Sequence, residues 1–211
     1  MHDLQLSTKK LRASPPTDAE FAKFLKATRG EMEILIRQLS DGVFDAREWG
    51  EMMQQLLILS HGESWALGRQ RAGDFADETR YDHLVGIAKA DSQAPYLLNL
   101  IEDLTGERYL DDLGKISPNK LKGRLNLYAQ SLRGTATDSF INASDALIEL
   151  NWTLGGVEKH CSDCPRYASM NPWYKDTLYA WPGSGDTPCL GNCKCHLVRE
   201  DGVMSFKPVT L

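Results

Sequence analysis

The chain has 211 residues, of which 42% are hydrophobic and 25% are charged. This composition is typical of a soluble globular protein with one domain, or one domain and a small annex. Its 24 Lys and Arg residues are outnumbered by 29 Asp and Glu residues, which argues against a DNA-coating protein because duplex affinity comes largely from cationic side chains. No stretch reaches the ~18 apolar residues of a membrane span, and the N-terminus lacks the apolar region of a signal peptide.

The first part of the chain predicts an extended arm followed by two helices. Residues 1–16 contain two consecutive prolines and few apolar residues, which favours an arm. Thr17-Asp18-Ala19-Glu20 and Asp45-Ala46-Arg47-Glu48 both have the form of a capping box, and apolar residues at helical spacing follow each of them. We therefore expect one helix over residues 17–41 and a second that starts at residue 45 and ends between residues 62 and 73.

Residues 74–109 show a weaker helical pattern. Apolar residues from Tyr81 to Ala88 and from Tyr96 to Leu104 predict two shorter helices. Pro95 lies between them, and proline disrupts a helix interior because it lacks a backbone N–H. We expect the break between the two helices to lie near this proline.

The strongest helical pattern starts at Ser117-Pro118, an N-cap followed by a proline in the first turn. Apolar or small residues then recur every three or four positions, at Leu121, Leu125, Tyr128, Leu132, Ala136, Phe140, Ala143, Leu147 and Leu150. A continuous helix of ~33 residues would be ~50 Å long, so we expect part of its apolar stripe to bind another protein. A break near Gly123 or Gly134 is the alternative, since each glycine lowers helix propensity by ~1 kcal/mol.

The composition changes after Leu150. Gly155-Gly156 and four prolines between residues 165 and 188 disfavour a continuous helix. We expect a mainly α protein with an arm over residues 1–16, a helical domain with one long amphipathic helix over residues 17–150, and a small turn-rich, Cys-rich module over residues 151–211. A module of about 60 residues is small for an independent core, so a metal ion would stabilise it.

All five cysteines lie within 35 residues, at Cys161, Cys164, Cys189, Cys193 and Cys195. The C-x-x-C pair can present two thiolates to one tetrahedral ion, and the later cluster supplies further ligands. This pattern predicts a structural zinc ion with no open position for water. Cys161 and Cys164 are the expected ligands, together with Cys195 and either Cys189 or Cys193. Unligated thiols, or a disulfide with spare thiols, are the alternative.

Two further groups of residues accompany the cysteines. His160 and His196 flank the two clusters and are also candidate ligands. The module is rich in aromatic residues: Trp152, Tyr167, Trp173, Tyr174, Tyr179 and Trp181. Such rings could stack on single-stranded nucleic acid, but aromatics around a small metal knuckle more often form its core. We expect the core role.

A catalytic metal site is the competing interpretation. His61-Gly62-Glu63 reads H-x-E and Pro188-Cys189 begins a P-C pair, as in the zinc nucleobase deaminases. That chemistry needs P-C-x-x-C, whereas the next cysteine here comes one residue late. His61 is better explained as a helix-face histidine that is solvated or bonded to a neighbour. The chain also lacks a G-x-S-x-G motif and a phosphate loop, so we expect no enzymatic activity.

The order of these motifs resembles that of one known family. A long amphipathic helix is followed by Trp152, by His160-Cys161-x-x-Cys164-Pro165-x-Tyr167-Ala168, by Pro182-Gly183-Ser184-Gly185-Asp186-Thr187-Pro188-Cys189 and by Cys193-Lys194-Cys195. Over about residues 124–197 this order resembles the minor head proteins of tailed bacteriophages, the head-morphogenesis family named after the F protein of phage Mu. Many members have His-Pro-x-Cys-Arg-Cys in the last cluster, and the resemblance implies that Cys189 stands in for that histidine.

The resemblance implies a structural role in a virion. Members of this family are low-copy components of the portal vertex or head interior that act in head assembly. We therefore expect a minor head protein that is assembled in the host cytoplasm, resides in the phage head and binds the portal protein or the major capsid protein. The alternative is a zinc-dependent regulatory or nucleic-acid-processing protein, which a basic strip beside the module would favour. The cationic residues there are dispersed in sequence: Lys159, Arg166, Lys175, Lys194 and Arg199.

Overall fold

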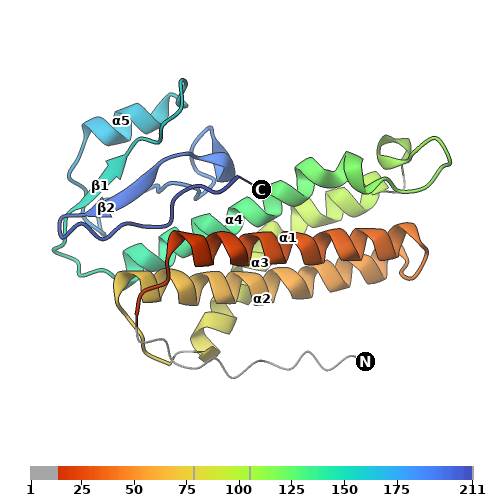
Figure 1. Ribbon diagram of the computed structural model, residues 1–211, viewed down its shortest axis with the longest axis horizontal. Helices are drawn as coiled ribbons and strands as arrows, with labels where there is room; N and C mark the ends of the chain where they lie inside the picture. The colour runs from red at the N-terminus through yellow and green to blue at the C-terminus, as the bar shows by residue number, and fades with distance from the viewer. Residues whose placement is uncertain (1–13, 78, 105, 211) are drawn as a thin grey trace.

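Four long helices pack side by side in a bundle, and a small module lies against one end of it (Figure 1). The computed structural model describes residues 14–77, 79–104 and 106–210. The bundle contains α1 (Asp18–Ser40), α2 (Ala46–Ala72), α3 (Thr79–Leu104) and α4 (Pro118–Ala143), with a short 3-10 helix η1 (Glu107–Tyr109) before α4. The structure confirms a mainly α protein with a Cys-rich C-terminal module. No helix in the described part of the chain is long and apolar enough to span a membrane.

The first two helices begin at the predicted capping boxes. The Thr17 side chain accepts a hydrogen bond from the backbone N–H of Glu20 at 3.2 Å, and Asp45 does the same for Glu48 at 2.8 Å. Both glutamates return a bond to the backbone N–H of the N-cap residue, so two free donors are satisfied at each helix start. The arm predicted over residues 1–16 lies outside the described residues, except for residues 14–16, which lead into α1.

The prediction of two helices around Pro95 is wrong, because α3 is one helix that runs through this proline. A proline inside a helix costs ~3 kcal/mol. Both halves of α3 nevertheless bury apolar residues in the same core cluster, with Ala90 before the proline and Leu97, Leu100 and Leu104 after it. Each buried leucine contributes ~1.5–3 kcal/mol, so packing of α3 on the bundle outweighs the cost of the proline.

The helix predicted to reach Leu150 ends earlier, because α4 stops at Ala143. The Ser144 hydroxyl donates to a carbonyl in the last turn of α4 at 2.8 Å, and the Asp145 carboxylate accepts from the backbone N–H of Leu147 at 2.9 Å. Such local side-chain bonds offer the backbone an alternative to the helix. Leu150 then enters a β-strand, so the helical spacing of the last two apolar residues does not reflect a helix.

The glycines of α4 do not break it either. Gly134 allows a loop of the module to approach the helix, since a Cβ atom at this position would lie 2.0 Å from the carbonyl oxygen of Gly183. Gly68 on α2 has the same function, because its Cβ atom would lie 2.0 Å from the carbonyl oxygen of Ala136 on α4. These glycines allow close packing between segments and do not form turns.

The apolar stripe of α4 packs inside the protein, so the expectation that part of it is exposed for a partner is wrong. Its members up to Phe140 are at most 7% exposed, and Ala143 at the helix end is half-buried: the buried ones are Leu121, Leu125, Tyr128, Leu132, Ala136 and Phe140. The bundle helices cover the first part, and the module covers Phe140. A helix of 26 residues is only ~39 Å long, which these neighbours can enclose. Leu147, at 83% exposure, lies beyond the helix end.

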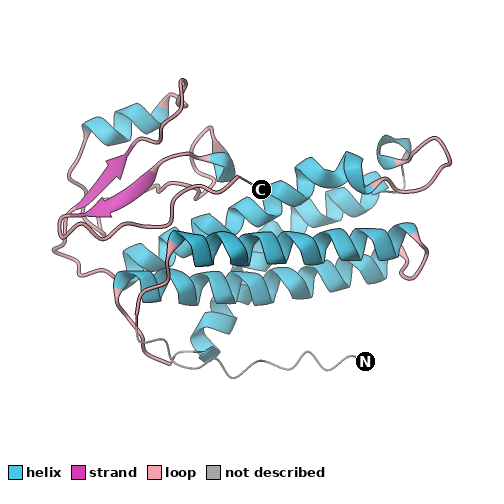
Figure 2. Cartoon of the chain, viewed as in Figure 1, coloured by secondary structure: helices cyan, strands magenta, loops and turns pink. Residues whose placement is uncertain are grey.

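The module is built around a two-stranded antiparallel sheet (Figure 2). β1 (Leu150–Thr153) pairs with β2 (His196–Arg199) in a register that places Trp152 opposite Leu197. A short helix α5 (Asp163–Ser169) and the 3-10 helix η2 (Leu190–Asn192) lie between the two strands in sequence. The sheet therefore brings together two chain segments that each carry one cysteine cluster.

The C-terminal tail connects the module back to the bundle. The Phe206 ring stacks on Phe21 of α1, with centroids 4.0 Å apart and planes at 6°. The Arg71 guanidinium of α2 donates to the carbonyl of Met204 at 2.8 Å and to that of Pro16 at 2.7 Å. The segment that precedes α1 and the segment that ends the chain are thus joined through one side chain.

Candidate metal centre

Two turns of the module present the five cysteines. Cys161 lies two residues before α5, and Cys164 lies in the first turn of this helix. Their Sγ atoms are 3.2 Å apart. Cys189 directly precedes η2, Cys193 directly follows it, and Cys195 directly precedes β2.

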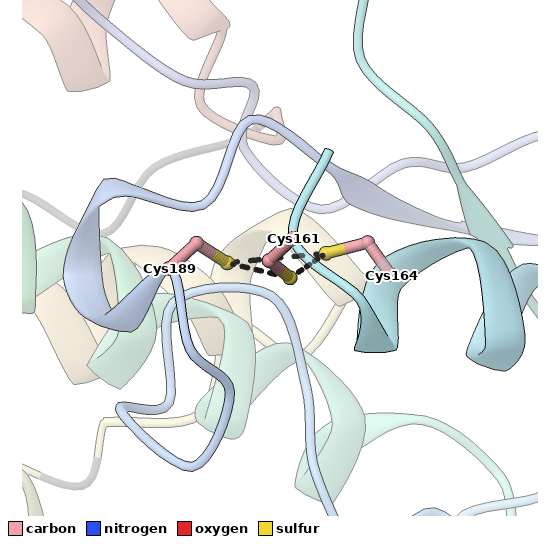
Figure 3. A group of neighbouring side chains, drawn as sticks. All are labelled: Cys161, Cys164 and Cys189. Atoms are coloured by element: carbon pink, nitrogen blue, oxygen red, sulfur yellow. Dashed lines mark hydrogen bonds between the residues drawn. The ribbon is translucent and has the colours of Figure 1, made fainter. Parts of the chain in front are cut away.

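The sulfur atoms form two groups that share Cys164. In the first group, drawn in Figure 3, the Sγ atom of Cys189 lies 3.5 Å from that of Cys161 and 3.9 Å from that of Cys164. In the second group, Cys164 and Cys193 have Sγ atoms 3.8 Å apart, and Cys195 completes the group. Within each group all Sγ atoms lie within 4.8 Å of one another. The fold therefore gathers all five thiols into one cluster.

This cluster could bind a metal ion such as zinc. With Zn–S bonds of ~2.3 Å, two ligands of a tetrahedral zinc ion have sulfur atoms about 3.8 Å apart. The observed distances of 3.2 to 3.9 Å are close to that spacing. All five cysteines are free thiols, so the disulfide alternative is not formed. Thiolates are soft ligands, and a purely cysteine donor set suits zinc.

Burial and crowding make several of these thiols hard to deprotonate. Burial raises the pKa of Cys189 to about 11 and raises that of Cys164 well above its usual range. The hydrogen bond with Cys195, followed by burial, raises the pKa of Cys193, and the same bond lowers the pKa of Cys195. A metal ion opposes these upward shifts because it binds the thiolate form, which also makes metal affinity depend on pH.

The grouping distinguishes among the predicted ligands. Cys189 belongs to the group with Cys161 and Cys164, whereas Cys195 belongs to the group with Cys164 and Cys193. His160 approaches Cys195, with Nδ1 3.8 Å from Sγ. Among the described residues, neither His160 nor His196 belongs to a group compact enough to hold an ion.

Comparisons with protein-family models, curated proteins and solved structures find no match. The resemblance to phage minor head proteins rests on the order of motifs over about residues 124–197 and stays a prediction.

Buried aromatic side chains form the core behind the cysteines. Trp152, Tyr167 and Trp173 are at most 5% exposed, and the Tyr167 ring lies 4.9 Å from Trp152 and 6.0 Å from Trp173 between centroids. The predicted core role is confirmed for these three residues. Tyr174 and Tyr179 are more exposed, although the Tyr179 ring still packs edge-on against Tyr167.

Arg133 is a site residue that the sequence analysis missed. It lies on α4, is fully buried, and donates from Nη1 to the carbonyl of Cys195 at 2.9 Å and from Nη2 to the carbonyl of Cys193. Its neighbour Gly134 was the available signal, since a glycine within a helical pattern often marks the close approach of another segment. The pattern does not say which segment approaches, so the contact with the cysteines could not be read from it.

His61, the starting point of the deaminase hypothesis, lies in the bundle and away from the cysteines. Its Nδ1 is 2.8 Å from the hydroxyl of Thr135, and the amide of Gln93 lies 3.0 Å from its Nε2. Among the described residues, the groups that could hold an ion include neither His61 nor Glu63. The prediction of a histidine bonded to its neighbours is confirmed.

We expect His61 to make the fold sensitive to acid. Burial lowers the pKa of His61 from 6.5 to about 4; the hydrogen bond with Gln93 opposes this shift, and the positive charge of Lys89 adds to it. Above pH 6.5 the ring is neutral in the folded and unfolded chain, so it contributes no pH dependence. Between pH 6.5 and 4 only the unfolded chain takes up the proton, so the free energy of unfolding falls by ~3 kcal/mol on reaching pH 4.

Denaturant unfolding of wild type and His61→Gln, at pH above 6.5 and near pH 4, measures this effect. Both proteins contain the same cysteine cluster, so acid release of metal contributes equally and cancels in the difference. We expect the wild type to lose more stability on acidification than the variant does. The same loss in both proteins would contradict the assignment to His61.

Proposed function

We propose that the module is a structural zinc module in which one Zn²⁺ is held by Cys161, Cys164, Cys189 and Cys193. The observation that carries this proposal is the compact group formed by the Sγ atoms of Cys161, Cys164 and Cys189, together with Cys193, whose Sγ atom lies 3.8 Å from that of the shared Cys164. Cys195, which is 0% exposed, belongs to the neighbouring group with Cys164 and Cys193. A zinc ion saturated by thiolates has no position for a reactive water, so it fastens the two cysteine turns together.

Elemental analysis of purified protein tests the site. We expect about one zinc ion per chain. Cys189→Ser and Cys195→Ser form a matched pair, since the chemical change is the same and only the first removes a proposed ligand. Cys189→Ser should lose most of the zinc, and Cys195→Ser should keep it. A wild-type protein prepared without chelators that holds no metal, and whose thiols all react quickly, would contradict the zinc site.

We propose further that the chain is a minor structural protein of a tailed-bacteriophage head, bound to the portal protein or to the major capsid protein on the head interior. The order of the helix, the C-x-x-C pair and the final cysteine cluster over about residues 124–197 supports this role. A zinc ion whose four ligands are all thiolates is typical of a structural site rather than a catalytic one. The net charge of -5 favours a protein partner over DNA.

Mass spectrometry of purified phage particles that encode this chain tests the role directly. We expect the chain in the particle at low copy number relative to the portal protein, and we expect it to co-purify with portal or capsid protein when they are expressed together. Particles that lack the chain would contradict the proposal. If the chain were instead found bound to nucleic acid in infected cells, the zinc-dependent regulatory or nucleic-acid-processing protein would replace it.

A further inference from the structure

Arg133 places a positive charge beside the second cysteine cluster. Its side chain is 0% exposed, and its two terminal nitrogens donate to the carbonyls of Cys193 and Cys195. Gly183 covers the guanidinium from another side, since a Cβ atom at that glycine would lie 3.4 Å from Nη2. The guanidinium is thus enclosed between the bundle and the turn that carries two of the cysteines.

A buried guanidinium is costly to maintain without a negative partner. The ion pairs between described residues include none to Arg133. Both carbonyls that it binds belong to cysteines of the cluster, at positions 193 and 195. The negative charge that this turn can offer the guanidinium is therefore that of its two thiolates.

The charge of a thiolate-bound zinc ion complements this cation. Four thiolates and one Zn²⁺ leave a net charge of about -2 in a partly buried site. We propose that Arg133 is a positioning residue of the metal centre, which offsets the charge of the metal-bound thiolates and fixes the Cys193–Cys195 turn beside the ion. This role depends on the proposed zinc site.

Arg71 provides a matched control for the test. It also donates from two nitrogens to two backbone carbonyls, those of Met204 and Pro16. Its other partners among the described residues are the Asp18 carboxylate and the Phe206 ring, not a cysteine. If arginine served only to satisfy carbonyls, Arg71→Gln and Arg133→Gln would both lower stability and leave metal affinity unchanged. A counter-charge role predicts that Arg133→Gln alone weakens metal binding.

The experiment measures zinc affinity by competition with a chromogenic chelator, together with the pH at which acid releases the ion. We expect Arg133→Gln to bind zinc ~10- to 100-fold more weakly and to release it at a higher pH, because protons compete better for thiolates that lack the cation. Arg133→Lys keeps the charge without the two-pronged geometry and should recover part of the affinity. Arg71→Gln should bind zinc as the wild type does while it melts at a lower temperature.

The outcomes separate the role of Arg133 from the zinc site itself. A wild-type protein without zinc affinity refutes the zinc site, whatever the variants do. If the wild type binds zinc and Arg133→Gln binds it equally tightly, the role of Arg133 is overturned. The role is also overturned if Arg133→Lys, or Arg71→Gln, loses as much zinc affinity as Arg133→Gln does. If Arg133→Gln does not fold, Arg133→Lys serves as the test. A loss of zinc affinity of more than ~10-fold in this variant, despite the retained charge, overturns the role of Arg133.

Discussion

Replacing Cys161 and Cys164 together by serine should abolish zinc binding and unfold the module while the four-helix bundle persists. Structural zinc supplies an apparent ~10–16 kcal/mol of binding free energy in zinc-finger peptides, and the two strands here have only four residues each. The helices α1 to α4 all end before Cys161. Phe140 of α4 is buried against the module, so the bundle should also lose some stability.

Two spectroscopic signals separate the module from the bundle. Far-ultraviolet circular dichroism should keep most of its helical intensity, whereas the near-ultraviolet signal and the fluorescence of Trp152 and Trp173 should change to those of exposed rings. Ser162→Ala, an exposed change between the two cysteines, is the control that should leave both signals intact. If the double variant kept its near-ultraviolet spectrum, the module would owe its structure to packing rather than to metal.

Leu132→Asp should unfold the bundle. Leu132 is 0% exposed and packs with Phe21, Leu25 and Phe206. Removing a buried leucine costs ~2–5 kcal/mol, and an unpaired carboxylate in the same place adds several kcal/mol of desolvation. The sum approaches the ~5–15 kcal/mol by which a typical domain is stable.

The matched control lies on the same helix. Leu127 of α4 is 39% exposed, so Leu127→Asp should change the free energy of unfolding by ~0.5 kcal/mol or less. Urea unfolding followed by circular dichroism, with soluble yield as a second measure, compares the two variants. A Leu132→Asp protein that unfolds like Leu127→Asp would show that this face of α4 is not core, and the stripe would again be available for a partner.

Local signals in the sequence predicted the helix starts because their physics is local. Thr17 and Asp45 cap helices through groups three residues away, so the pattern contains the whole interaction. The continuation of α3 through Pro95 depends on packing against other helices, and the end of α4 depends on the side chain of Ser144 and on a strand partner at Arg199. Ser144 lies within the periodic stretch, but its side chain leaves the apolar spacing unchanged. The helices that pack on α3 and the strand partner of Leu150 lie outside the window over which periodicity is judged.

The candidate site likewise combines features that the local sequence predicts with features that depend on the tertiary fold. The spacing of Cys161 and Cys164 predicted a metal-binding pair because both thiols come from one turn. Which later cysteine joins them depends on the turn after Cys189, where Leu190 adopts a left-handed φ of 50°, a conformation that sequence patterns assign to glycine. Arg133 reaches the cluster from a helix about 60 residues earlier in the chain, so its role follows only from the tertiary fold.

The stack of Phe206 on Phe21 also affects the order in which a growing chain can fold. The two rings are 185 positions apart in sequence, and at a synthesis rate of ~5–20 residues per second that distance takes about 10–40 s to translate. During that time α1 has been made, but the partners that cover Phe21 and Leu25, on α4 and in the tail, have not all been added. The apolar face of α1 is therefore the part of the nascent protein that waits longest for its native neighbours, and the part most in need of protection from premature association.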